Sequence, residues 1–115
     1  MKSITVRCKA SRKLAGEQTF SSFTELYLWL LRTFKDPSFA NHLIIAVAEK
    51  GEYKRLGRRD VEINSDSALG YRAKELARDI GLLIPVIGGD KYSRKEKKGL
   101  EFVEAVDKIL GVRRR

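Results

Sequence analysis

The first residues of the chain alternate between apolar and polar side chains. The apolar positions are Ile4, Val6, Cys8 and Ala10. A period of two residues is typical of a strand with one buried face. A short extended segment around Gln18 to Phe20 follows a turn-rich stretch, so residues 3–20 are predicted to form a β-hairpin with Cys8 facing the core.

The clearest helical pattern follows this hairpin. Ser22 and Glu25 have the spacing of a capping box, which begins a helix. Apolar side chains then recur at helical spacing: Phe23, Leu26, Tyr27, Leu30, Leu31 and Phe34. Pro37 disfavours helical dihedral angles in the residue before it, so the helix is predicted to stop at Asp36-Pro37.

The middle of the chain allows two interpretations. Residues 38–50 contain a β-branched run, but their apolar spacing, with Ser38 as a cap and Gly51 as a stop, favours a second helix. A strand pair is predicted around residues 53–55 and 61–63, and a short helix over 65–79 after a Ser65 or Asp66 cap. A strand at 43–49 with a full helix at 65–79 would instead give a ferredoxin-like sheet.

The last third contains an apolar run and a basic helix. The run from Ile80, IGLLIPVIGG, has the length and composition of a buried strand. We predict that Leu82–Ile87 lies in the middle of the sheet, parallel to residues 4–8. A final helix is predicted from a Ser93 and Glu96 capping box to Gly111.

This order of elements predicts an α+β fold of the ubiquitin-like β-grasp type. The expected architecture is a mixed sheet with one or two packing helices and an added C-terminal basic helix. Residues 1–89 would form the β-grasp domain and residues 90–115 the basic helical extension. With 115 residues in all, the chain has room for one domain and not for two.

Composition narrows the class of protein. The chain is 43% hydrophobic and 34% charged, and no apolar run approaches the roughly 20 residues of a membrane-spanning helix. The net charge is +9, and it is densest after residue 90. The basic residues there that we predict to dock on a partner are Lys91, Arg94, Lys95, Lys97, Lys98, Arg113, Arg114 and Arg115. Such a segment suits nucleic-acid phosphate, an acidic protein surface or plain solvation.

A second basic cluster lies in the predicted turn between the paired strands. Its members are Lys54, Arg55, Arg58 and Arg59. Tyr53 is the only aromatic residue near them, whereas proteins that bind single-stranded nucleic acid interleave several aromatic rings with their cations. The cluster is therefore predicted to contact an acidic partner protein, with nucleic acid as the less favoured alternative.

Residues that could support catalysis are few. Cys8 and His42 are the only cysteine and histidine, so no metal site with two such ligands can form. A Cys-His nucleophile pair would need Cys8 to point outward, against its strand position. The carboxylates Glu49, Glu52, Asp60 and Glu62 fall around the predicted strand pair and are interpreted as solvated. We therefore predict no enzymatic activity, no metal and no cofactor.

Three segments resemble known families. The segment ITVRCKASRKLAGE resembles the first hairpin of ubiquitin-like proteins, and IPVIGG resembles the final strand and diglycine of sulfur carriers. The segment NHLIIAVAEKGEYKRLGRRDV is similar to the tail assembly protein I family of lambda-like phages. The similarity extends over residues 3–90. Two features depart from it, namely the helical character of residues 65–79 and the basic helix after the diglycine.

This resemblance implies a structural role in building the tip of a non-contractile phage tail, by protein–protein docking. The implied partners are the central fibre protein, a tip protein with a metal cluster and a tip protein with a peptidase. The implied location is the tail tip of the virion, and the host cytoplasm during assembly. The alternative is a ubiquitin-like modifier or sulfur carrier that is processed at Gly88-Gly89. The same two glycines are also a candidate hinge.

Overall fold

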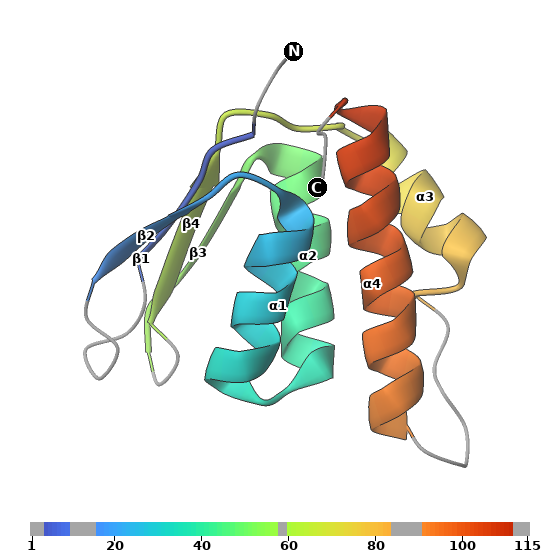
Figure 1. Ribbon diagram of the computed structural model, residues 1–115, viewed down its shortest axis with the longest axis horizontal. Coiled ribbons are helices and arrows are strands. Elements are labelled where there is room, and N and C mark those ends of the chain that lie inside the picture. The colour runs from blue at the N-terminus through green and yellow to red at the C-terminus, as the bar shows by residue number, and fades with distance from the viewer. Residues whose placement is uncertain (1–3, 10–15, 58–59, 84–90, 112–115) are drawn as a thin grey trace.

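Four short strands form one antiparallel sheet in the computed structural model, which describes residues 4–9, 16–57, 60–83 and 91–111 (Figure 1). The strands are β1 (Val6–Lys9), β2 (Glu17–Phe20), β3 (Glu52–Arg55) and β4 (Val61–Ser65). Their order across the sheet is β2-β1-β4-β3. The predicted hairpin at the N-terminus and the predicted strand pair are both confirmed.

The alternation read from the sequence decides which face of the sheet is buried. Val6 and Cys8 of β1 are buried, while Arg7 and Lys9 are exposed. Val61 and Ile63 of β4 lie on the same buried face. The helices cover this face, and no helix of the described ranges lies on the opposite face of the sheet (Figure 1).

Helices α1 (Phe23–Phe34) and α2 (Pro37–Lys50) pack directly on the sheet. Ser22 caps α1, because its hydroxyl oxygen accepts a hydrogen bond from the backbone N–H of Glu25 at 3.1 Å. The cap of α2 is Asp36, and the prediction of Ser38 was wrong. Pro37 occupies the first turn of α2, where its missing N–H costs nothing, so Asp36-Pro37 begins α2. Helix α1 ends before it, at Phe34, with Lys35 in the left-handed conformation as its C-cap.

Helices α3 (Arg72–Ile80) and α4 (Lys91–Ile109) form the outer layer. Helix α4 packs on α1 and α2, and α3 packs beside α2 and α4 (Figure 1). The predicted cap of α3 at Ser65 or Asp66 was wrong, because Ser65 still belongs to β4 and the cap position is Tyr71. In the described ranges no helix combines the length and the apolar character needed to cross a membrane.

The chain thus has the predicted α+β fold, with an antiparallel sheet packed against helices in an arrangement consistent with a ubiquitin-like protein. The ferredoxin-like alternative is excluded, because residues 43–49 lie within α2. The C-terminal basic helix is present as α4, but the predicted start at a Ser93 and Glu96 capping box was wrong, because the helix begins at Lys91 and includes both residues.

The predicted central strand over Leu82–Ile87 does not have the expected neighbour. Strand β1 pairs with β2 on one edge and with β4 on the other, so neither edge is free for another strand. Ile80 ends α3, Gly81 caps it, and Leu82 and Leu83 form a turn. Residues 84–87 lie outside the described part of the chain. The apolar character of this run is accounted for in part by Ile80 and Leu82, which pack against the core.

Helix α4 shares the hydrophobic core of the rest of the chain. Phe102, Val103 and Val106 are fully buried and belong to the same cluster as the inward side chains of the sheet. The predicted boundary at residue 89 therefore does not separate two cores, because residues before and after it belong to one hydrophobic core.

A buried carboxylate joins α4 to the beginning of α1. Asp107 is 2% exposed and accepts hydrogen bonds from the backbone N–H groups of Phe23 and Thr24, at 2.8 and 3.1 Å. It also accepts one from the Thr24 hydroxyl at 2.6 Å. These N–H groups belong to the first turn of α1, which has no partners for them within the helix and carries a partial positive charge. Asp107 therefore acts as a second cap for α1, supplied from the far end of the chain.

A second polar contact fixes the middle of α4. The Tyr27 hydroxyl donates to Asn41 Oδ1, and Asn41 Nδ2 donates to the backbone carbonyl of Lys95 at 3.2 Å. Burial, and then the negative charge of Glu96, raise the pKa of Tyr27, so its hydroxyl remains a donor. Gly99 of α4 faces this contact, and its missing side chain leaves room for Tyr27.

Candidate functional site

The face of the sheet that carries no helix is lined with polar side chains from all four strands. We call this surface the outer face, and the register places eight residues on it: Arg7, Lys9, Glu17, Thr19, Glu52, Lys54, Glu62 and Asn64. All are exposed except Glu62, which is half-buried. Side chains on one face of neighbouring strands lie within contact distance of each other, so the outer face forms a continuous surface.

Charges on the outer face alternate in one row. Lys9 pairs in register with Glu17 on one side and Glu62 on the other, and Glu62 pairs with Lys54. From β2 to β3 the row is therefore acidic, basic, acidic, basic. The neighbouring row reads Thr19, Arg7, Asn64, Glu52 in the same order. These eight described residues have no net charge together, because three of them are basic and three are acidic.

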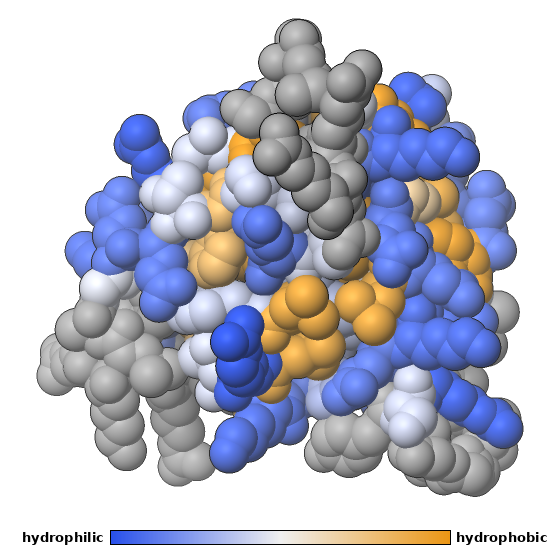
Figure 2. Space-filling model, viewed as in Figure 1, coloured by the Kyte–Doolittle hydropathy of each residue, from blue (hydrophilic) through white to orange (hydrophobic). Residues whose placement is uncertain are grey.

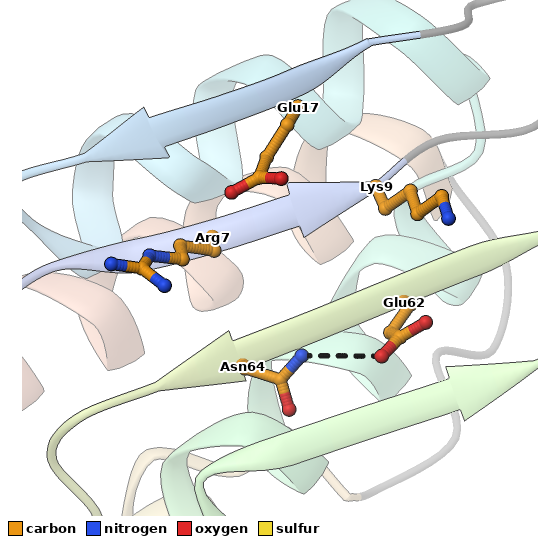
Figure 3. Close-up of a pocket in the computed structure, with 5 residues that line it drawn as sticks. All are labelled: Arg7, Lys9, Glu17, Glu62 and Asn64. Atoms are coloured by element: carbon orange, nitrogen blue, oxygen red, sulfur yellow. Dashed lines mark hydrogen bonds between the residues drawn. The ribbon is translucent and has the colours of Figure 1, made fainter.

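A hollow of about 260 Å³ lies on this face, between β2, β1 and β4. Figure 3 shows its lining from the outer side, with the helices behind the sheet. The Glu17 carboxylate points toward β1, and Asn64 Nδ2 donates to Glu62 Oε1 at 3.5 Å (Figure 3). The charged ends of Arg7 and Lys9 extend from β1 in opposite directions. The hollow thus offers both donors and acceptors to a bound surface.

No family model, curated protein or solved structure matches this chain. The similarity to the tail assembly protein I family therefore depends on the sequence segments alone. The function that it implies is a proposal, and the geometry of the outer face has to be weighed with it.

The predicted basic cluster of the β3–β4 turn does not form one surface in the part that the structure describes. Lys54 lies on the outer face, whereas Arg55, the next residue of the strand, lies toward the helices. The Arg55 guanidinium sits 6.0 Å from the centre of the Phe39 ring, in a cation–π contact. Arg58 and Arg59 lie outside the described residues.

The predicted docking residues of the C-terminal segment have different roles. Lys95 donates to the Ser38 hydroxyl, and Lys98 donates to the carbonyl of Ile80 at 3.0 Å, at the end of α3. Arg94 and Lys97 are exposed on α4. Two of the predicted cations therefore hold neighbouring helices in place, and two are available to a partner. The side chain of Lys91, and Arg113, Arg114, Arg115, Gly88 and Gly89, lie outside the described residues.

Cys8 and His42 lie far from a catalytic arrangement. Cys8 is 1% exposed beneath the sheet, and burial raises the pKa of its thiol to about 12. His42 is exposed on α2, where its ring meets the Tyr53 ring edge to face at 5.6 Å between centroids. Among the described residues no group of three His, Cys, Asp or Glu side chains could hold a metal ion.

The four carboxylates singled out in the sequence do not converge. Glu49 of α2 forms an ion pair with Lys74 of α3 at 3.3 Å. Glu52 and Glu62 lie on the outer face, and their side chains contribute to its alternating charges. Asp60 is half-buried just before β4. Glu49 therefore links two helices, and Glu52 and Glu62 contribute to a surface.

Apolar side chains on the helical side form a different surface feature. Trp29 is half-buried, with its ring 5.7 Å from Phe20 of β2 and 6.2 Å from Phe34. Figure 2 shows an apolar patch near the middle of the view, surrounded by hydrophilic residues. Leu28 is the exposed large apolar residue of α1, at 42%. Exposed apolar side chains are ordinary on a protein surface.

The outer face is the feature that sequence reasoning missed. Alternation placed Arg7 and Lys9 outward, but the row of charges depends on which residues of four separate strands stand side by side. The signal available in the sequence was that each predicted strand has charged residues at its outward positions.

The buried thiol leads to a prediction about pH. Unfolded chains release the cysteine proton near pH 8.5, whereas folded Cys8 retains it up to about pH 12. The stabilisation is complete below pH 8.5 and is lost as the pH rises through this window. We expect the free energy of unfolding to fall by up to roughly 1.4 kcal/mol per pH unit there. Urea unfolding of the native chain and of Cys8→Ala at several pH values measures the difference, and equal slopes would contradict it.

Proposed function

We propose that this chain is an assembly protein of the tip of a non-contractile phage tail, which acts by docking and without catalysis. The proposal combines the resemblance to the tail assembly protein I family with the outer face of the sheet. Its proposed partners are the central fibre protein, the metal-cluster tip protein and the peptidase-bearing tip protein. Its proposed location is the virion tail tip, after assembly in the host cytoplasm.

The observation that carries the proposal is the alternating row of charges across the outer face, the side of the sheet away from the described helices. A surface with charges of both signs discriminates between partners, because a mismatched partner brings like charges together. Arg94 and Lys97 on α4 provide further exposed cations on the opposite side of the body. Two separate polar surfaces suit a subunit that lies between others in an assembly.

The burial of α4 weighs against the sulfur-carrier and modifier alternative. Cleavage after Gly89 would separate α4 from the rest of the chain, and with it Phe102, Val103, Val106 and Asp107. A carrier activated at Gly89 would have to remain folded without these side chains. Three fully buried apolar residues are a large part of the core of a small domain.

The charge balance of the outer face weighs against nucleic-acid binding there. Phosphate binding needs a surface on which cations dominate, so that counterions are released from the nucleic acid. Three carboxylates on the outer face would repel a phosphate backbone. Arg55, one of the predicted phosphate contacts, is engaged with Phe39.

The test uses a phage whose genome encodes this chain. Inactivation of the gene is expected to abolish infectious particles and to leave tails without complete tips in electron micrographs. Supplying the intact protein in trans should restore both. Lys9→Glu with Lys54→Glu, which disrupts the outer face, should restore neither.

A matched control reverses two charges elsewhere. Arg72 and Arg78 are exposed on α3, away from the sheet, and Arg72→Glu with Arg78→Glu should complement like the intact protein. Complete tips and a normal titre in the absence of the gene would refute the proposed function. Complementation by the outer-face variant would refute the role of that surface.

A further inference from the structure

We propose that the outer face binds the same face of a second copy of this chain. The two copies would be related by a two-fold axis that runs parallel to the strands, between β1 and β4. The inference rests on the outer face being a contact surface, as proposed above, and it names the partner. Its basis is the order of charges across the sheet.

A two-fold axis along the strands reverses the order of strands in the second copy. Strand β2 then faces β3, and β1 faces β4. When the order acidic, basic, acidic, basic is reversed in the second copy, each charge of the row comes opposite a charge of the other sign. Glu17 comes opposite Lys54 of the second copy and Lys9 opposite Glu62 of the second copy, and symmetry repeats both pairs.

The neighbouring row fits the same arrangement. Arg7 comes opposite Asn64 of the second copy, whose side-chain oxygen can accept a hydrogen bond. Glu52 comes opposite Thr19 of the second copy, whose hydroxyl can donate one. Like charges therefore do not meet directly in either row.

The other face-to-face arrangement is disfavoured by the same residues. A two-fold axis running across the strands would exchange the two rows and keep the strand order. Arg7 would then come opposite Lys9 of the second copy and Glu52 opposite Lys54 of the second copy, so two repulsive pairs would offset two attractive ones, whereas the first arrangement has attractive charge pairs alone. The charges thus distinguish one two-fold arrangement from the other.

The size of the face determines how strong the dimer is. Four strands about 4.8 Å apart, each of four or five residues, offer far less than the roughly 800 Å² per partner of a standard interface. Exposed ion pairs are weakened by salt. We therefore expect a weak, salt-sensitive dimer, which the high local concentration of an assembly would favour.

Analytical ultracentrifugation of the full chain tests the inference. At about 0.1 M salt, where the repulsion between two copies of net charge +9 is screened beyond roughly 10 Å, the dimer fraction should rise with protein concentration up to about 1 mM. At about 1 M salt it should disappear. Lys9→Glu or Glu62→Lys alone should weaken association about tenfold or more, since each turns two attractive pairs into repulsive ones.

Mixing the two variants provides the decisive measurement. In a mixed pair the new carboxylate at position 9 faces the new ammonium at position 62, and the native Glu62 and Lys9 still face each other. The mixture should dimerise at least as well as the native chain, while each variant alone stays monomeric. Arg72→Glu, on α3, should leave the native dimer unchanged, and thermal unfolding of each variant establishes that it is folded.

A native chain that remains monomeric at about 0.1 M salt would overturn the inference, and so would a mixture that does not associate. A dimer that persists in Lys9→Glu would also overturn it. These measurements need no phage protein. A monomeric chain whose loss still leaves tails without tips would refute the dimer and leave the proposed function intact.

Discussion

A chain that ends at Gly89 is expected not to fold. It would lack Phe102, Val103 and Val106, which are fully buried against the helices and sheet. Removal of a single buried phenylalanine side chain costs roughly 3–5 kcal/mol, and small domains have only about 5–15 kcal/mol of stability in total. The first turn of α1 would also lose Asp107, the acceptor of three hydrogen bonds. The combined loss exceeds what the remaining core can supply.

Circular dichroism and amide NMR spectra of the two chains measure this effect. The truncated chain should show no cooperative thermal transition, and a synthetic peptide of residues 90–115 added in trans should restore native spectra. A chain that ends at Gly111 is the control, because it retains every described residue of α4 and should unfold like the full chain. A cooperatively folded chain ending at Gly89 would contradict the prediction and would revive the carrier alternative.

This expectation reverses the one based on the sequence, which predicts a β-grasp domain of residues 1–89 and a basic helical extension of residues 90–115 added to it. The high density of lysine and arginine after residue 90 is typical of a solvated segment. The packing of helix α4 explains why its composition alone did not reveal that the helix belongs to the core. Lys95 bonds to Ser38 of α2 and Lys98 to the carbonyl of Ile80 at the end of α3, while Phe102, Val103 and Val106 further along α4 enter the core. Long basic side chains commonly flank a buried contact in this way.

Local patterns predicted the elements whose ends are set by neighbouring residues. The alternation of β1, the cap at Ser22 and the stop at Gly51 depend on residues close in sequence, and the structure confirms them. The choice of a helix over residues 38–50 is confirmed as well. In these cases the physical cause lies within one turn of the residue concerned.

Contacts between distant segments could not be read from the sequence. The neighbour of β1 on its inner edge is β4, but a run such as Leu82–Ile87 has the same apolar character as a central strand. The charge row of the outer face depends on the register of three strand pairs, which no local signal specifies. The sequence therefore predicts that the strands carry charged residues at outward positions, but it does not predict which of these residues lie side by side on the outer face.

Gly99→Ala is expected to destabilise the protein, although alanine favours helices over glycine by about 1 kcal/mol. Gly99 lies in the interior of α4 and is buried against α1 and α2. A Cβ atom there would come closer than 3.0 Å to the Tyr27 side chain and to Asn41 Oδ1, a spacing that Cβ atoms essentially never show. Tyr27 is fully buried and cannot move aside, so α4 must shift.

We expect a net loss of about 1–3 kcal/mol, measured as the free energy of unfolding in urea. Glu101→Ala is the matched control, since Glu101 is exposed two residues further along α4 and its substitution should change stability by less than about 0.5 kcal/mol. A Gly99→Ala chain that is more stable than the native one would show that helix propensity outweighs the close contact.

A double-mutant cycle separates the steric cause from a general weakness of α4. Tyr27→Leu shortens the side chain that occupies the space next to Gly99, and it removes the hydroxyl that bonds to Asn41. In that background Gly99→Ala should cost little or should stabilise the protein, because the added methyl group fills space that the ring has left. The coupling energy between the two sites should then be about 1–3 kcal/mol. Equal costs in both backgrounds would mean that the glycine is needed for a reason other than the approach of Tyr27, and that α4 is held against α1 chiefly by its apolar stripe and Asp107.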